Sequence, residues 1–264
     1  MEACKMLSTS IMVTDYCTLN CKLCLAYIPY LRERKRLSLA EAKIVFYNYF
    51  SMVDHVDKFS ITGGEPFTNT ELVDILLELF KYRSRISEII IITNGTIKLP
   101  DEFLEVASKE RKLKVIVNNY GSISKFAGEN RELLGKHGIT NILYDDSNRY
   151  DWVDCRDHSL KNKIESEIKA QAASCVFFQG KKYLINHGKL YTCTRSWYRI
   201  ENNLIPYSKE DYIKLTEKDF DVEKSREKLL NLMARKYSTS CAYCSGRTEK
   251  SILYPAAEQL TKGD

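Results

Sequence analysis

The stretch Cys17-Thr-Leu-Asn-Cys21-Lys-Leu-Cys24 brings three cysteines into one short segment, with no fourth cysteine close by. Thiolates are strong ligands for iron and zinc, so this spacing indicates a metal site. A [4Fe–4S] cluster is usually held by four cysteines, and three would leave one iron open to a small molecule. A structural zinc site and a chance group of thiols are the alternatives that the spacing alone leaves open.

A second motif follows in Asp57-Lys-Phe-Ser-Ile-Thr-Gly-Gly-Glu-Pro66, where a short apolar strand runs into two glycines, an acid and a proline. Gly63 and Gly64 carry no side chain, so a ligand can approach the backbone closely. Pro66 ends the strand because it cannot donate to a sheet. Alone, these four residues would indicate an ordinary turn, but following the three cysteines they favour a ligand site.

Together the two motifs resemble the radical S-adenosylmethionine (radical SAM) enzymes, in the Cys-x3-Cys-x2-Cys spacing and in a complete Gly-Gly-Glu-Pro. The resemblance implies a [4Fe–4S] cluster on Cys17, Cys21 and Cys24, with its open iron chelated by the amino and carboxylate groups of SAM. An electron from the cluster then splits the sulfonium, and the 5′-deoxyadenosyl radical removes a hydrogen atom from the substrate. The loop Gly63, Gly64, Glu65 and Pro66 is expected to accept hydrogen bonds from the SAM ammonium group.

Strand and helix patterns alternate along the first part of the chain. Strands are predicted at Ser8–Asp15, Phe59–Thr62, Glu88–Thr93, Leu113–Asn118 and Asn141–Tyr144. Helices are predicted at Leu39–Val53, Thr70–Tyr82, Pro100–Lys109 and 125–137, the first of them capped by Ser38 with Glu41 three residues on. This alternation predicts an α/β fold with a parallel sheet, which the resemblance identifies as a partial (β/α) barrel. Its chemistry should lie at the carboxyl ends of the strands.

Polar residues at those strand ends complete the expected SAM pocket. Thr93-Asn94-Gly95 ends the third predicted strand and resembles what many radical SAM enzymes place near the ribose and methionyl carboxylate. Asn118 ends the fourth strand, although such residues are also ordinary turn formers. Leu23 stands where the family more often has an aromatic residue beside the adenine, and an aliphatic side chain can still cover a ring face.

A second group of cysteines lies in the last part of the chain. Cys175 and Cys193 flank two predicted strands, Lys182–Asn186 and Lys189–Thr192, that meet in a turn at His187-Gly188. Cys241-Ala-Tyr-Cys244 completes the group, and no cysteine follows it. The arrangement resembles the twitch domain, the truncated form of the SPASM auxiliary-cluster domain, built from a hairpin plus a helix. The resemblance implies that these four cysteines ligate a second [4Fe–4S] cluster, with a Cys4 zinc site as the alternative.

The resemblance therefore covers nearly the whole chain. It predicts a radical SAM barrel over residues 1–150, a connecting segment over 151–169, and a twitch domain over 170–264. The chain has 264 residues, 44% of them hydrophobic, with nine cysteines and a net charge of +5. Clustered cysteines and the absence of a long apolar run or signal peptide favour a cytoplasmic enzyme without a membrane span. The mild charge does not favour nucleic acid but permits an acidic redox partner, of flavodoxin or ferredoxin type.

The predicted reaction is dehydrogenation of a small hydroxylated molecule, such as a sugar or aminocyclitol, with the auxiliary cluster accepting an electron. Few residues precede Cys17, which disfavours the peptide-recognition module of many peptide-modifying relatives. A peptide-modifying maturase and a radical epimerase remain alternatives, and the epimerase would use Cys155 as hydrogen donor. Arg156 is predicted to hold a substrate hydroxyl or phosphate, and Asp154, Asp157 or His158 to accept a proton. A solvated linker is the alternative for these charged residues.

Overall fold

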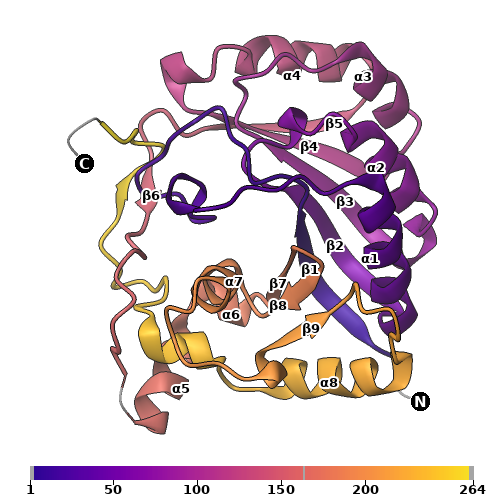
Figure 1. The fold of residues 1–264 in the computed structure, drawn as a ribbon. Coiled ribbons are helices and arrows are strands. Elements are labelled where there is room, and N and C mark those ends of the chain that lie inside the picture. Colours follow the sequence, from indigo (N-terminus) through magenta and orange to yellow (C-terminus); the bar gives the residue numbers. More distant parts are fainter. Residues whose placement is uncertain (1–2, 163, 262–264) are drawn as a thin grey trace.

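An eight-stranded sheet lies at the centre of the protein (Figure 1), whose computed structural model describes residues 3–162 and 164–261. In spatial order its strands are β5 (Thr140–Asp145), β4 (Leu113–Asn119), β3 (Ile86–Thr93), β2 (His55–Thr62), β1 (Lys5–Met12), β7 (Lys182–Asn186), β8 (Lys189–Tyr191) and β9 (Tyr212–Lys214). Two further short strands, β6 (Tyr150–Trp152) and β10 (Tyr254–Pro255), pair with each other in antiparallel fashion.

The strands from β5 to β7 are all parallel, so their carboxyl ends meet at one edge of the sheet. Met12 is paired with Thr62 at the ends of β1 and β2, and Thr93 with Val117 near the ends of β3 and β4. The fold is therefore the predicted α/β class with a mostly parallel sheet. The strands β1 to β5 all lie close to their predicted positions. Their bounds differ by a few residues, as at β1, which starts at Lys5 and ends at Met12.

The helices α1 to α4 follow the outer, convex side of this sheet (Figure 1). The helices of the described chain are α1 (Leu39–Met52), α2 (Leu72–Phe80), α3 (Asp101–Ala107), α4 (Ala127–Lys136), α5 (Glu165–Ser174), α6 (Val176–Gln179), α7 (Thr194–Glu201) and α8 (Val222–Ala234). Short 3-10 turns are η1 (Ile28–Tyr30), η2 (Pro66–Thr68), η3 (Arg83–Arg85), η4 (Gly121–Ile123), η5 (Lys209–Asp211) and η6 (Thr239–Tyr243). Ser38 caps α1 as predicted, by accepting a hydrogen bond from the Glu41 backbone at 3.2 Å.

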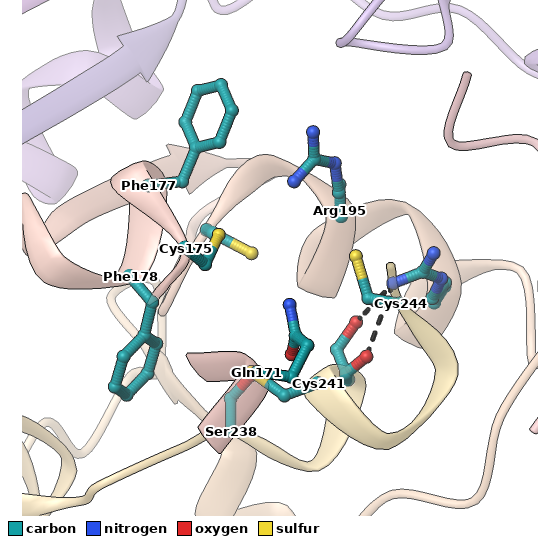
Figure 2. A pocket seen from close by; sticks show the side chains of 11 residues that line it. Gln171, Cys175, Phe177, Phe178, Arg195, Ser238, Cys241 and Cys244 are labelled. Atoms are coloured by element: carbon teal, nitrogen blue, oxygen red, sulfur yellow. Dashed lines mark hydrogen bonds between the residues drawn. The ribbon is translucent and has the colours of Figure 1, made fainter. Parts of the chain in front are cut away.

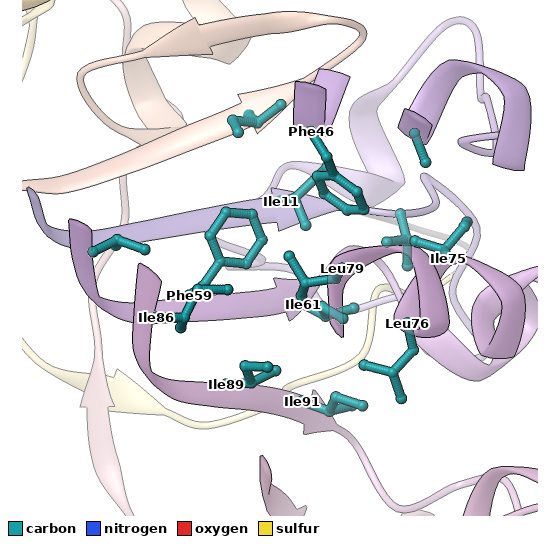
Figure 3. Packing of buried hydrophobic residues seen from close by; sticks show 14 of the residues in the cluster. Ile11, Phe46, Phe59, Ile61, Ile75, Leu76, Leu79, Ile86, Ile89 and Ile91 are labelled. Carbon is teal, nitrogen blue, oxygen red and sulfur yellow. The ribbon is translucent and has the colours of Figure 1, made fainter. Parts of the chain in front are cut away.

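The main core fills the space between the sheet and its outer helices. Figure 3 shows Ile61 and Phe59 of β2 packed against α1 and α2 through Phe46 and Leu79. The four consecutive isoleucines predicted to form a buried strand lie in β3, where Ile89 and Ile91 have no exposed surface. Burial of these branched side chains on both faces of a parallel strand accounts for the unbroken apolar run in the sequence.

The predicted hairpin joins the main sheet, a connection that the sequence did not reveal. β7 pairs in parallel with β1, and β8 returns antiparallel to it through the turn at His187-Gly188. Both turn residues have positive φ, of 45° and 66°, as a two-residue hairpin turn of this kind requires. The hairpin satisfies the backbone of β1 along an edge that would otherwise be unpaired. The sheet is thus continuous across the predicted domain boundary.

A second group of buried residues lies on the inner side of the sheet, and we call it the inner cluster. It consists of Met12, Tyr27, Ile28, Leu184, Tyr191, Trp197, Tyr198, Ile200, Ile205 and Tyr212. Tyr27 stacks on Tyr198, with ring centroids 4.0 Å apart and planes 10° from parallel. The inner cluster therefore joins the segment after β1 to the C-terminal part of the chain. Over the described residues, none of the helices is both long and apolar enough to span a bilayer.

Candidate functional site

The first three cysteines lie in the segment between β1 and α1, beside the carboxyl edge of the sheet. We call residues 17–24 the cysteine loop. Cys17 Sγ accepts hydrogen bonds from the Leu19 backbone at 3.4 Å and from the Asn94 amide at 3.5 Å. Burial raises the pKa of the Cys17 thiol to about 11 and that of the Cys21 thiol to about 12. A metal that binds these sulfurs must therefore displace their protons.

Glu65 links the Gly-Gly-Glu-Pro motif to the end of β3. Its carboxylate is fully buried and accepts hydrogen bonds from the Thr93 hydroxyl at 2.9 Å and the Asn94 backbone at 2.7 Å. Burial raises the pKa of Glu65 to about 7. The two motifs that the sequence placed at separate strand ends are therefore one hydrogen-bonded unit, and Asn94 connects this unit to Cys17.

The two glycines of this motif allow the cysteine loop to pack directly on the strand end. A Cβ on Gly64 would lie 2.1 Å from the Tyr16 carbonyl oxygen, and one on Gly63 would lie 2.4 Å from that of Thr14. From the sequence, both glycines were expected to allow close approach by a ligand. The close approach seen in the structure is that of the chain's own backbone, where Gly64 N donates to Thr14 O at 2.8 Å.

The remaining residues predicted for the SAM pocket surround the same edge of the sheet. Pro66 is buried in the first turn of η2, and Leu23 is 7% exposed within the cysteine loop. Asn118 lies half-buried near the end of β4, where its carbonyl oxygen accepts a hydrogen bond from the Ser124 hydroxyl at 3.3 Å. The strand-end motifs and the cysteine loop are thus neighbours in space, as the topology predicted.

Gln259 contacts the cysteine loop and was missed by the sequence analysis. Its amide donates to Cys21 Sγ at 3.2 Å, and its side-chain oxygen accepts from the Asn20 backbone at 2.7 Å. Backbone hydrogen bonds on either side, from Lys22 to Glu258 and from Leu260 to Asn20, hold this C-terminal strap on the loop. No local pattern could have revealed a contact between residues so far apart in sequence.

The other four predicted ligands surround one pocket in the C-terminal part of the chain (Figure 2). We call it the second pocket, and it contains about 300 Å³ of space free of protein atoms, part of it open to solvent. Its sulfur atoms come from three separate segments: Cys175 lies between α5 and α6, Cys193 at the N-terminus of α7, and Cys241 and Cys244 in and directly after η6. The convergence that the sequence predicted for these cysteines is present.

Local hydrogen bonds orient these thiols. Cys193 Sγ accepts from the Ser196 backbone at 3.4 Å, and Cys244 Sγ accepts from the Gly246 backbone at 3.3 Å. The Ser238 hydroxyl lies 3.4 Å from Cys241 Sγ. Over residues 3–162 and 164–261, no group of three or more His, Cys, Asp or Glu side chains is close enough to hold a single metal ion. A [4Fe–4S] cluster spreads its ligands over four irons, so the four thiols need not converge on one point.

Two buried arginines also line the second pocket, and the sequence analysis did not identify them. Arg195 is 3% exposed and Arg199 is fully buried. Burial acts to raise the pKa of the Cys244 thiol, but the guanidinium groups of Arg195 and Arg199 outweigh it, so the net shift is downward. A pocket with two buried cations and four thiols has the donors and the charge to fit an anionic iron–sulfur cluster.

Cys155 lies in the segment that follows β6. It packs against the inner cluster, as Cys17 and Cys24 do, and its carbonyl oxygen accepts a hydrogen bond from the Tyr27 hydroxyl at 2.8 Å. Burial raises the pKa of the Cys155 thiol to about 11, opposed by the positive charge of Arg195. Cys155 is therefore a largely protonated thiol at neutral pH.

The charged residues that follow Cys155 differ in their exposure to solvent and in their partners. Arg156 is exposed and forms two hydrogen bonds to Asp154, at 3.0 and 2.7 Å. Asp157 is exposed and paired with Lys161. His158 is half-buried, and its Nδ1 accepts a hydrogen bond from Arg199 Nε at 3.2 Å. Burial, and then the charge of Arg199, lower the pKa of His158, so its ring is neutral near pH 7.

Comparisons with known proteins agree with this architecture. Residues 11–121 match the model of the Radical SAM superfamily. A crystal structure of BtrN in complex with AdoMet and 2-DOIA has a TM-score of 0.57 and 19% identity, covering 98% of this chain and 100% of that one. Native anSMEcpe with bound AdoMet and Kp18Cys peptide gives 0.53 and 12%, over 97% and 93% of the two chains. Streptococcus suis SuiB bound to precursor peptide SuiA gives 0.50 and 15%, over 97% and 75%.

No curated protein matches the chain in sequence. The family match covers the cysteine loop and the ends of β2 to β4, and the similar structures share the fold over almost the whole chain. Together these findings support a radical SAM-like α/β fold for the chain.

Proposed function

We propose that this protein is a radical SAM oxidoreductase that dehydrogenates a small hydroxylated molecule, such as a sugar or aminocyclitol. The observation that carries the proposal is the arrangement of two unlike sets of cysteines: three on one loop that packs against the inner cluster, and four around a separate pocket. The first set suits a cluster with an open iron, and the second suits a fully ligated one.

SAM would be held at the carboxyl edge of the sheet. Cys17, Cys21 and Cys24 would hold the first [4Fe–4S] cluster, and the remaining contacts would come from the strand-end residues: Leu23 beside the adenine, with Gly63, Gly64, Glu65, Pro66, Thr93, Asn94 and Asn118 around the methionyl group and ribose. When bound, SAM and this cluster supply the 5′-deoxyadenosyl radical. The chain's part is to bind and orient that group.

The second pocket would hold a second [4Fe–4S] cluster on Cys175, Cys193, Cys241 and Cys244. We favour this cluster over the Cys4 zinc alternative because zinc would supply no redox chemistry at this pocket. A site without an open iron cannot chelate SAM and is suited to electron transfer.

The dehydrogenation balances as follows. The substrate carbinol carbon loses a hydrogen atom, which forms 5′-deoxyadenosine, and the substrate radical then loses one electron and the hydroxyl proton to give a ketone. The electron would pass to the second cluster, and the hydroxyl proton would pass to a base, for which Asp154, Asp157 and His158 are the candidates. The Nδ1 of His158 already accepts a hydrogen bond from Arg199, so His158 would have to give up that bond to take the proton. An outside donor of flavodoxin or ferredoxin type would supply the electron that the first cluster needs.

Release of 5′-deoxyadenosine tests the first part of this proposal. Anaerobically reconstituted protein with dithionite and SAM should release it, and the Cys17→Ala/Cys21→Ala/Cys24→Ala variant should not. Cys241→Ala/Cys244→Ala is the matched control, which should still cleave SAM but form no oxidised product. Absence of 5′-deoxyadenosine from the wild-type protein, or equal release by the first variant, would refute the proposal.

Radical epimerisation is a second candidate, because Cys155 is a protonated thiol that packs against the same inner cluster as Cys17 and Cys24. A thiol S–H can return a hydrogen atom to the face opposite the adenosyl radical. Dehydrogenation puts no solvent deuterium on the reacting carbon, whereas epimerisation quenched by a thiol does. Cys155→Ala should then cleave SAM without forming an epimer, and a normal epimer yield would exclude this role.

The substrate class is part of the same proposal. BtrN was crystallised with 2-DOIA and resembles this chain over the full length of both, which supports a small molecule. The peptide-bound structures of anSMEcpe and SuiB keep a peptide-modifying maturase as the alternative. Incubation with candidate polyols and with peptides, followed by mass spectrometry for a loss of two hydrogens, distinguishes the two classes.

A further inference from the structure

Two buried cations line the second pocket with part of their hydrogen-bonding capacity unused. Nε and Nη2 of Arg195, and Nη2 of Arg199, have no hydrogen-bond partner among the described residues. Figure 2 shows the Arg195 guanidinium and the sulfur atoms of Cys175 and Cys244 around the same space. Arg195 also lies over the Phe177 ring at 4.7 Å, which compensates only weakly for the loss of water.

Buried charges of one sign require a group of the opposite sign. A buried guanidinium without an anion is strongly unfavourable, and the two arginines already act on the Cys244 thiol in favour of its anionic form. An iron–sulfur cluster with its four thiolates carries negative charge, and that charge increases by one unit when the cluster takes up an electron. Positive groups at close range therefore stabilise the reduced form more than the oxidised form.

We propose that Arg195 and Arg199 raise the reduction potential of the second cluster above that of the first, so that it accepts the substrate's electron. This inference rests on the proposed function, since it assumes that the second pocket holds a [4Fe–4S] cluster. Arg195 and Arg199 are positioning residues, because they act on the potential of the cluster and touch neither SAM nor the reacting carbon.

The groups around the cysteine loop differ in charge from those around the second pocket. The groups that donate to its thiols are neutral: the Leu19 backbone and the amides of Asn94 and Gln259. The side chain that acts most strongly on Cys17 by its charge is the carboxyl of Glu65. The groups that act directly on Cys17 and Cys21 are therefore neutral or acidic, whereas the second pocket is lined by two cations, which orders the two potentials in the direction that the electron must travel.

The two arginines are not equivalent as targets. Arg199 is anchored to His158 Nδ1 and to the Ser240 hydroxyl at 2.9 Å, so its removal would also disturb the surrounding fold. Arg195 has two unpartnered nitrogens and is the better target. Gln171 lines the same pocket, and its side-chain oxygen is buried without a partner. Gln171→Glu would place a negative charge in the pocket while keeping both arginines.

The experiment is a redox titration of the anaerobically reconstituted holoprotein, followed by electron paramagnetic resonance. Addition of SAM changes the signal of the first cluster only, which identifies each signal. In Arg195→Gln, the ratio of reduced to oxidised second cluster at a fixed potential should fall at least about tenfold, or 59 mV for one electron, with the first cluster unchanged. Gln171→Glu should shift the ratio in the same direction, whereas Arg195→Lys should largely preserve it.

The exposed Arg111→Gln is the matched control for loss of one positive charge far from the site, and should leave both potentials unchanged. An intact second cluster whose potential is the same in wild type, Arg195→Gln and Gln171→Glu would overturn the inference. If Arg195→Gln does not load iron, Gln171→Glu decides alone. Zinc or no metal in the second pocket of the wild-type protein would instead refute the proposed function, which keeps the two failures separate.

Discussion

The cysteine loop and the second pocket gather thiols in opposite ways. The loop takes three cysteines from one continuous segment and is held by neutral donors and by the Glu65 carboxyl. The second pocket takes four cysteines from three segments, and two buried arginines line it with them. A site on one loop is specified by local sequence, whereas a site assembled from distant segments depends on the fold being complete.

The same difference bears on chemistry. Cleavage of a sulfonium requires a strongly reducing cluster, which neutral or acidic surroundings favour. Acceptance of an electron from a substrate radical requires a cluster with a higher reduction potential, which the buried arginines favour. The inner cluster packs against Cys17, Cys24 and Cys155, and within it Tyr27 stacks on Tyr198.

The largest effect is expected for a substitution that disrupts the packing of the cysteine loop and leaves the second pocket intact. Gly64→Ala places a methyl group 2.1 Å from the Tyr16 carbonyl oxygen and 2.9 Å from the Cys17 Cβ, so the cysteine loop must move. We expect a loss of about 4 kcal/mol or more in unfolding free energy. Iron content should fall by about half, and the second cluster should keep its spectrum.

Gly128→Ala is the control for that substitution. Gly128 lies in α4, and a Cβ there meets nothing within 4 Å. Alanine at this position should stabilise the protein by about 0.5–1 kcal/mol and leave both clusters loaded. Equal stability of Gly64→Ala and wild type in urea unfolding would show that the loop is not held against the strand end.

The next effect is a pH dependence carried by Glu65. Its pKa rises on folding from 4.5 to about 7, so its contribution to stability is present below pH 4.5 and is lost as pH rises through about 7. The difference in unfolding free energy between wild type and Glu65→Gln, measured without iron, should therefore change by ~3 kcal/mol across this interval. A difference in unfolding free energy that does not change with pH would contradict the raised pKa of Glu65.

The contrast between the sites also explains what the sequence could predict. Cys17, Cys21, Cys24 and the Gly-Gly-Glu-Pro run are local patterns, and the alternating strands place them at one edge by topology. The spacing of Cys175, Cys193, Cys241 and Cys244 predicted a shared pocket because the hairpin between the first two is also a local pattern. The carboxyl ends of the strands were therefore predictable as the site.

The unpredicted features all join segments that are distant along the chain. The contact of Gln259 with Cys21, the pairing of β7 with β1, and the unused donors of Arg195 arise only after the chain folds. An arginine two residues after a cysteine looks like an ordinary surface residue in the sequence. Its burial in a pocket is a tertiary property, which no periodicity encodes.

A smaller effect is expected at the C-terminal strap. Gln259→Leu removes the N–H donor to Cys21 Sγ and the acceptor for the Asn20 backbone. Hydrogen bonds to sulfur stabilise the reduced cluster. The reduction potential of the first cluster should therefore fall by the equivalent of one hydrogen bond, ~1 kcal/mol. Gln179→Leu, whose amide binds only the Ala172 carbonyl in the described chain, is the control. A shift in the reduction potential of the second cluster instead of the first would contradict the placement of Gln259 at the first cluster.

The smallest effect is expected at Arg156, which lies outside both sites. Its ion pair with Asp154 is exposed, so Arg156→Gln should change the unfolding free energy by less than ~1 kcal/mol and leave SAM cleavage intact. If Arg156 leaves Asp154 to hold a substrate hydroxyl or phosphate, the variant should raise KM while kcat and both potentials stay constant. Asp154→Asn frees Arg156 from its partner and should lower KM. Unchanged KM in both variants would leave Arg156 as a solvated residue of the connecting segment, and the search for substrate contacts would then move inward to His158 and Cys155.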